Sequence, residues 1–201
     1  MSDNKVLKWV GTRPDRPDGV DKVIGRAAFG ADFVVAGMIH GKVVRSPHAH
    51  ARIKKIDTSK AEALKGVKAV ITAADLPDIP SEEAFVGEGP VNFRDLALNT
   101  MARDKVLYDG HAVAAIAAVS PSIAEEAARL VEVEYEVLPH VIDVEDAMKA
   151  DAPLLHDDLF TAGVDPKPTK PSNVAKRVEF KLGDSKAAFD KADVVVEGRY
   201  T

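Results

Sequence analysis

Two histidines, separated by a single residue, are the first candidates for chemistry. His48 and His50 stand in the run Arg-Ser-Pro-His-Ala-His-Ala-Arg, residues 45–52. On a β-strand they would point to the same face and could hold a divalent metal ion through neutral imidazole nitrogens. The other histidines that could supply a third ligand are His40, His111, His140 and His156. Because Pro47 disturbs the strand register and the sequence brings no third ligand close, we expect structural histidines between two strands.

Three further segments have residue types that could support catalysis or phosphate binding. The run His156-Asp157-Asp158 could be a metal cluster, or a base beside its orienting carboxylate. It lies in a proline-rich segment without a nucleophile motif, so we expect it to form a turn. Residues 25–30 and 87–89 are rich in glycine, but neither has the sequence context of a phosphate loop. We therefore assign no catalytic, cofactor-binding or metal-ligating residue to the sequence.

The composition limits the classes of protein that the chain can represent. Of its 201 residues, 46% are hydrophobic and 29% are charged, as in ordinary globular proteins. Cysteine is absent, which excludes disulfides, thiolate zinc sites, cysteine-ligated iron–sulfur clusters and cysteine nucleophiles on this chain. The longest apolar run, residues 112–119, is too short to span a bilayer, and no apolar signal segment follows Met1. We expect a cytoplasmic protein without a membrane partner.

The charge is unevenly distributed along the chain. The first 70 residues carry a net charge of +7 and the remainder carries −12. A basic first third could form a nucleic-acid face, but Trp9, Phe29 and Phe33 are the only aromatic residues there that could stack on bases. We therefore expect a solvated basic surface that faces an acidic neighbour, and we do not expect nucleic acid as a partner.

Two stretches show strand–helix–strand patterns. In the first, strands are expected over residues 37–44, 51–56 and 67–72, with a short helix between Ser59 and Gly66. In the second, strands are expected over residues 105–108, 112–119 and 133–137. Asp109-Gly110 predicts a hairpin turn, and Ser120 followed by Pro121 predicts the start of a helix.

The remaining segments are less regular. Residues 73–104 are poor in regular pattern, and so long a connection is typically functional or mobile, so it could cover a neighbouring surface. Asp143 can cap a short helix, and residues 153–172 hold four prolines, which predicts an extended surface segment. A third unit is expected from strands at 174–182 and 194–196 around a helix that opens at residues 183–185. The three repeated units indicate an α+β fold, in which helices pack on a mixed β-sheet.

Several short runs follow one another in an order that is typical of one family. They are Asp21-Lys22-Val23-Ile24-Gly25-Arg26-Ala27, Gly41-Lys42-Val43-Val44-Arg45-Ser46-Pro47-His48-Ala49-His50-Ala51-Arg52-Ile53, Ile56-Asp57-Thr58-Ser59, Asp75-Leu76-Pro77, Tyr108-Asp109-Gly110-His111-Ala112-Val113-Ala114, Val133-Glu134-Tyr135-Glu136-Val137-Leu138-Pro139 and Ala192-Asp193-Val194-Val195-Val196-Glu197. Together they resemble the N-terminal α/β hammerhead domain of the molybdopterin-binding large subunit of the xanthine dehydrogenase/aldehyde oxidase family. One departure is His111, where the family commonly has glutamine.

The resemblance implies a parent enzyme that hydroxylates aromatic heterocycles or aldehydes with oxygen from water. A molybdenum–pterin cofactor would receive the electrons, and [2Fe–2S] clusters and FAD on partner subunits or domains would pass them on. The family's pterin-binding loops and catalytic glutamate lie downstream of this domain, so the resemblance implies a fragment that binds no cofactor and is inactive alone. Its partners would be the molybdopterin-binding domains of the same subunit and the iron–sulfur and FAD components.

The resemblance also implies a division of the chain into four parts. They are an extended arm at residues 1–20, the hammerhead domain at 21–150, a proline-rich segment at 151–173, and the truncated start of the molybdopterin-binding region at 174–201. The hammerhead would pack on its partners through the strand at residues 45–52 and the loop at 77–104. Two alternatives remain open: a stand-alone module that docks its basic third on an acidic protein or nucleic acid, and a small metal-dependent hydrolase built on His48 and His50.

Overall fold

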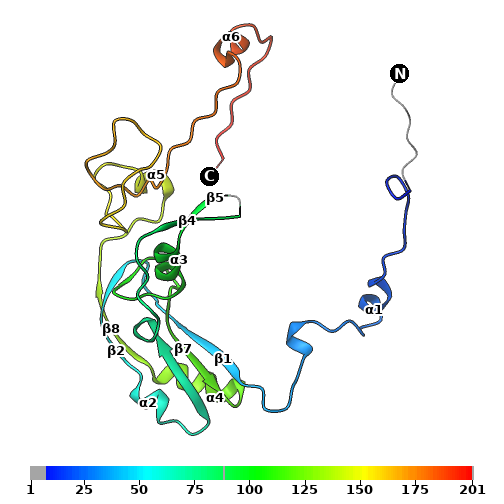
Figure 1. The fold of residues 1–201 in the computed structure, drawn as a ribbon, viewed down its shortest axis with the longest axis vertical. Helices are drawn as coiled ribbons and strands as arrows, with labels where there is room; N and C mark the ends of the chain where they lie inside the picture. The colour runs from blue at the N-terminus through cyan, green and yellow to red at the C-terminus, as the bar shows by residue number, and fades with distance from the viewer. Residues whose placement is uncertain (1–7, 88, 201) are drawn as a thin grey trace.

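The computed structural model describes residues 8–87 and 89–200, and it places the strands in three small antiparallel sheets (Figure 1). The first sheet has the order β1 (His40–Arg45), β7 (Ala112–Ala118), β3 (Val67–Thr72). The second sheet has the order β6 (Lys105–Val106), β2 (Ala51–Asp57), β8 (Glu132–Val137). The third is a hairpin of β4 (Glu83–Val86) and β5 (Gly89–Asn92). The expected α+β class is confirmed, with the strands divided among these sheets.

Two helices connect the first and second sheets. The short helix α2 (Ser59–Glu62) follows β2 and leads into β3, and α4 (Pro121–Leu130) follows β7 and leads into β8. Because β3 pairs with β7 and β2 pairs with β8, each strand–helix–strand unit crosses from one sheet to the other. The first two expected units are therefore confirmed, although the strands of each unit lie in different sheets.

Local sequence explains where α4 begins and how closely it packs. Ser120 caps the helix, since its hydroxyl accepts a hydrogen bond from the backbone N–H of Ile123, and Pro121 occupies the first helical position. Gly66 meets this helix with a φ of +99°, and a Cβ built there would lie 2.8 Å from Cδ1 of Ile123. Only glycine combines that backbone conformation with so close an approach.

The core consists of two clusters of small and branched side chains. Ala51, Ala102, Val106 and Val113 form the first, and Ala61, Ile116 and Ala127 form the second. Val44 packs against both clusters, so the two sheets and the two helices share one continuous interior. The strand and helix residues that the sequence marks as apolar supply this core.

The expectation for residues 73–104 is wrong, because this stretch contains regular elements. It forms a 3-10 turn, η2 (Ala73–Asp75), then the β4–β5 hairpin and the helix α3 (Phe93–Thr100). Asn92 caps α3, since its side-chain oxygen accepts from the backbone N–H groups of Arg94 and Asp95. The prolines and glycines that suggested a loop stand at the element ends and in the hairpin, where they are tolerated.

Asp109-Gly110 forms a turn but no hairpin. The strand before it, β6, pairs with β2 in the second sheet, whereas the strand after it, β7, lies in the first sheet. Residue 110 has a φ of +80°, and the turn is closed by the backbone N–H of His111, which donates to the Tyr108 carbonyl. The turn therefore passes the chain between two sheets, which a pairing signal in the sequence alone does not show.

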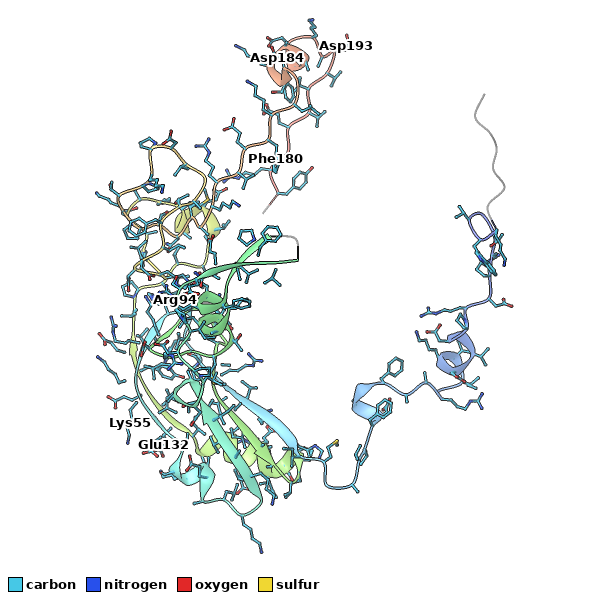
Figure 2. The ribbon with its side chains drawn as sticks, in the orientation of Figure 1. Lys55, Arg94, Glu132, Phe180, Asp184 and Asp193 are labelled. Carbon is cyan, nitrogen blue, oxygen red and sulfur yellow. The ribbon has the colours of Figure 1, made fainter. Side chains whose placement is uncertain are left out.

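The third expected unit is formed only in part. Short helices α5 (Val144–Ala147) and α6 (Ser185–Phe189) are present, but residues 174–182 and 194–196 belong to no strand, contrary to the prediction. No neighbouring strand of the described chain supplies a hydrogen-bond ladder, and Phe180 and Leu182 are 94% and 99% exposed. Figure 2 shows Phe180 in this segment, away from the first and second sheets.

The beginning of the described chain extends away from the sheets (Figure 1). Residues 8–39 contain only α1 (Gly19–Val23) and a 3-10 turn, η1 (Gly30–Asp32), and none of their side chains is buried. The described part of the expected arm, residues 8–20, consists of bends, turns, irregular backbone and the first residues of α1. Among the described residues, no helix has both the length and the apolar character that a membrane span requires.

Candidate functional site

The segment that carries His48 and His50 is a turn between β1 and β2, so the expectation that residues 45–52 continue as a strand is wrong. Pro47 interrupts the strand, and Ser46 holds the turn with its hydroxyl, which accepts from the backbone N–H of His48 at 3.0 Å. The His48 ring packs edge-on against the Tyr135 ring, with 5.0 Å between the ring centroids.

His50 is buried and joins the turn to the second sheet. Its Nδ1 lies 2.7 Å from the carbonyl oxygen of Pro139, so this nitrogen carries the proton and donates. The other nitrogen, Nε2, is buried without a hydrogen-bond partner among the described atoms. Within residues 8–87 and 89–200, no group of three or more metal-ligating side chains is arranged around a common point. Both histidines therefore hold this turn against the second sheet, His48 through Tyr135 and His50 through the Pro139 carbonyl.

His111 is the most deeply buried polar side chain near the junction of the two sheets. It is fully buried, and its Nδ1 accepts a hydrogen bond from the backbone N–H of Leu107 at 3.2 Å. Its ring stacks on Tyr108 at 4.3 Å between centroids, and the Tyr108 hydroxyl donates to the Asn99 carbonyl at 2.7 Å. The histidine thus connects the turn after β6 to the end of α3.

The hydrogen bond from Leu107 fixes the protonation state of His111. Since Nδ1 accepts, the proton of the neutral ring stays on Nε2, near the carbonyls of Leu98 and Asn99 but outside hydrogen-bond geometry. Burial lowers the pKa of His111 below its ordinary value, and the two carbonyls oppose this effect without cancelling it. The structure therefore holds a neutral imidazole at this position.

His156-Asp157-Asp158 forms a turn, as expected, and its carboxylates are paired with cations. Asp158 accepts a hydrogen bond from Nη2 of Arg94 at 2.7 Å, and Asp157 lies 3.4 Å from Nζ of Lys105. The Arg94 guanidinium lowers the pKa of Asp158 by this hydrogen bond, and in turn Asp158 raises the pKa of Arg94. Charge pairing of this kind fastens the segment after α5 to the start of α3, where Figure 2 places Arg94.

Arg94 was not singled out from the sequence, although the sequence contains a signal for α3, the helix that positions it. Asn92 is a good capping residue, and the apolar residues Phe93 and Leu96 follow it at helical spacing.

Beside Arg94 lies a cleft of about 480 Å³, lined among others by Arg52, Arg94, Lys105, Asp157 and Asp158. Because its charges of both signs largely neutralise one another, the cleft shows no preference for a charged ligand.

The glycine-rich runs lie at turns. Gly25 follows α1 with a φ of +74°, and Gly30 begins the η1 turn. Gly87, with a φ of +63°, turns the β4–β5 hairpin, and Glu88 lies outside the described residues. Neither run connects a strand to a helix, which is the arrangement that a phosphate loop requires.

Comparisons with known proteins agree on one family. Residues 24–139 match the family model described as aldehyde oxidase and xanthine dehydrogenase, a/b hammerhead domain. The chain is 37% identical to the carbon monoxide dehydrogenase large chain of Afipia carboxidovorans, over 97% of this chain and 24% of that protein. It is 36% identical to the xanthine dehydrogenase molybdenum-binding subunit of Escherichia coli O157:H7, over 92% of this chain and 23% of that protein.

A solved structure supports the same assignment. The Cu,Mo carbon monoxide dehydrogenase in its carbon monoxide reduced state matches with a TM-score of 0.68 and 36% identity, over 92% of this chain and 23% of that chain. The chain thus spans about a quarter of the length of the relatives that it matches. Residues 24–139 are a hammerhead domain, and the chain belongs to the aldehyde oxidase and xanthine dehydrogenase family.

Proposed function

We propose that the chain serves as the hammerhead part of a molybdenum hydroxylase, as a packing domain whose parent enzyme hydroxylates heterocycles or aldehydes with oxygen from water. The observation that carries this proposal is the similarity to members of the family, which covers 92–97% of this chain but only about a quarter of each relative. The chemistry-bearing side chains support a structural role, since His50, His111 and Asp158 all serve to join elements.

The residues of this chain do not fit the redox cofactors that the family implies. The sequence has no cysteine to ligate a [2Fe–2S] cluster. The glycine runs at residues 25–30 and 87–89 lie at turns without the strand-to-helix geometry that cradles phosphate groups. In our proposal the molybdopterin, the iron–sulfur clusters and FAD are held by other domains or subunits.

The region at residues 77–104 supports the expected packing on such partners. Phe85 is 78% exposed on β4, and Phe93 and Leu96 are about half exposed on α3. Large apolar side chains gathered on one hairpin and helix are typical of an interaction surface. The other expected surface, residues 45–52, does not fit this role, because Ser46, His50 and Ala51 are buried inside the domain.

The alternative of a nucleic-acid module gains no support from the described residues. The basic side chains of β2 and α2 lie beside carboxylates: Lys54 pairs with Glu136, and Lys60 pairs with Glu132. Figure 2 shows Lys55 and Glu132 on this side of the second sheet. Since these acids offset the positive charge, the first third of the chain does not form a uniform phosphate-binding surface here.

The experiment is to isolate the chain through an affinity tag from the cells that make it, without denaturation. We expect co-purification with polypeptides that contain molybdenum, identified by mass spectrometry and elemental analysis. A chain that consistently purifies without such polypeptides would refute the proposal. Binding of labelled DNA or RNA that weakens steeply with salt would instead support the alternative.

A further inference from the structure

One face of the first sheet is apolar where its three strands pair side by side. Arg45 shares this side by alternation but lies at the end of β1, beyond the last residue pair of β3 and β7. The residues of β1, β7 and β3 that share the apolar part lie in register: Val43 opposite Ala115, which is opposite Ile71, and Gly41 opposite Ala117, which is opposite Ala69. Because side chains alternate along a strand, these six residues point to the same side. We call this set the open face, consisting of Gly41, Val43, Ala69, Ile71, Ala115 and Ala117.

The other face of the same sheet is covered by helices. Val44, Val70 and Ile116 point there and pack with Ala61 of α2 and Ala127 of α4. Lys42 also lies on the helix side, since its ammonium group is 3.6 Å from the carboxylate of Glu125 on α4. Figure 1 shows α4 beside β7 and β1. No such layer covers the open face in the described chain, and Val43 and Ile71 are each 39% exposed.

The second sheet provides an internal contrast. Its outward side carries charged residues, among them Arg52, Lys54, Glu134 and Glu136, and Lys54 pairs with Glu136 at 2.5 Å. An antiparallel sheet with one wet face is expected to alternate apolar and polar residues in this way. The first sheet lacks that alternation, although the same chain and the same packing helices build it. Its open face therefore has the composition of a covered surface.

We infer that the open face of the first sheet is a permanent docking surface for the remainder of the large subunit to which this domain belongs. The inference rests on the proposed function. Interfaces that never open are the most apolar ones, whereas transient partners leave charged groups within their surfaces. The relatives are about four times as long as this chain, so the remainder of such a subunit is large enough to cover the whole face.

The small residues of the open face determine which partner surface can pack on it. Gly41, Ala69, Ala115 and Ala117 leave a flat surface, so a helix or sheet of the partner can approach the strands closely. Val43 and Ile71 stand at one end of this surface as the larger contacts. The occupant is therefore expected to present an apolar surface without a charged group opposite the open face, since an unpaired charge there would be buried at high cost.

Single cysteines test this inference cleanly, because the chain has none of its own. Val43→Cys and Ile71→Cys place a thiol on the open face, and Lys54→Cys places one on the charged face of the second sheet as a control. Labelling by a maleimide is followed by mass spectrometry in the chain alone and in the tagged assembly. Assembly should slow labelling of Cys variants on the open face by about tenfold or more, since a covered thiol reacts only when the contact opens. The Lys54→Cys variant should stay reactive.

A charged variant provides a second readout. Ala117→Glu should leave the isolated chain folded, judged by far-UV circular dichroism, and should abolish co-purification with the rest of the subunit. Normal co-purification of this variant would contradict the inference.

The other outcomes separate this inference from the proposed function. Rapid labelling of Val43→Cys in a molybdenum-containing assembly would overturn the docking surface and leave the proposed function intact. Slow labelling of the chain alone, together with a dimeric mass by light scattering, would show that a second copy of the chain covers the open face. This result would also overturn the open face as a docking surface for the rest of the subunit. A chain that purifies without partner polypeptides and without molybdenum from the cells that naturally make it, with a reactive open face, would overturn both proposals.

Discussion

Acidification should weaken the fold through His111. In the folded chain its Nδ1 accepts a hydrogen bond from the backbone N–H of Leu107. A proton added to Nδ1 would therefore replace this hydrogen bond with two N–H groups that face each other in a fully buried site. The groups that face the ring are Tyr108 and the carbonyls of Leu98 and Asn99, and none of them is an anion that could compensate a positive charge.

The sign and size of the effect follow from proton linkage. The pKa of His111 is lowered in the folded state, so below about pH 6.5 the unfolded chain binds a proton that the folded chain does not. Stability from this residue is present above the unfolded pKa and is lost as pH falls toward the folded pKa. One proton corresponds to at most about 1.4 kcal/mol per pH unit within that window.

The assay is urea unfolding at pH 7.5, 6.5 and 5.5, followed by far-UV circular dichroism. His111→Gln should reduce the dependence on pH, because a neutral amide can accept from Leu107 and donate toward the Leu98 carbonyl. His140→Gln, at an exposed histidine, is the matched control and should behave as the natural chain does. Equal pH slopes for the natural chain and His111→Gln would contradict this role of His111.

Three further predictions concern stability. Gly66→Ala should lower the free energy of unfolding in urea by about 1–3 kcal/mol, because the methyl group would meet Ile123 in a backbone conformation that favours glycine. Gly183→Ala is the control: residue 183 has a φ of +70° in open surroundings, so the loss should be smaller, and equal losses would contradict the prediction. Arg94→Ala should speed the hydrogen exchange of residues 153–172, and unchanged exchange would contradict a stabilising role of the Arg94–Asp158 ion pair. Arg129→Ala removes an exposed ion pair with Glu125 and should change the free energy of unfolding by less than about 0.5 kcal/mol. Asn173→Ala should destabilise by about 1–3 kcal/mol, because its side chain bonds Leu155, Ala147 and Pro153, and an unchanged unfolding midpoint would show that these bonds add nothing.

Local patterns predicted the central elements of the fold. The apolar run of β7 and the Ser120-Pro121 start of α4 have strong signals in a few neighbouring residues, and both elements form as expected. The motifs that carry the family resemblance are likewise short local runs, which explains why the family was identified from the sequence.

Features that depend on distant partners were not predictable in this way. The turn at Asp109-Gly110 has a hairpin signal, but the pairing of β6 with β2 depends on residues more than fifty positions away. Residues 174–182 have strand-like alternation, yet a strand also needs a neighbouring strand, and the described chain supplies only an isolated bridge between Ala162 and Lys176. His111 and Arg94 likewise gain their roles from contacts that only the folded chain creates.

The direct test is the molybdenum content of this chain when it is produced without its partner polypeptides, in a foreign host that makes the molybdenum cofactor. We expect a folded chain with no molybdenum or pterin above the level found on an unrelated control protein. One molybdenum bound per chain would contradict it, because the cofactor would then have a site within these 201 residues.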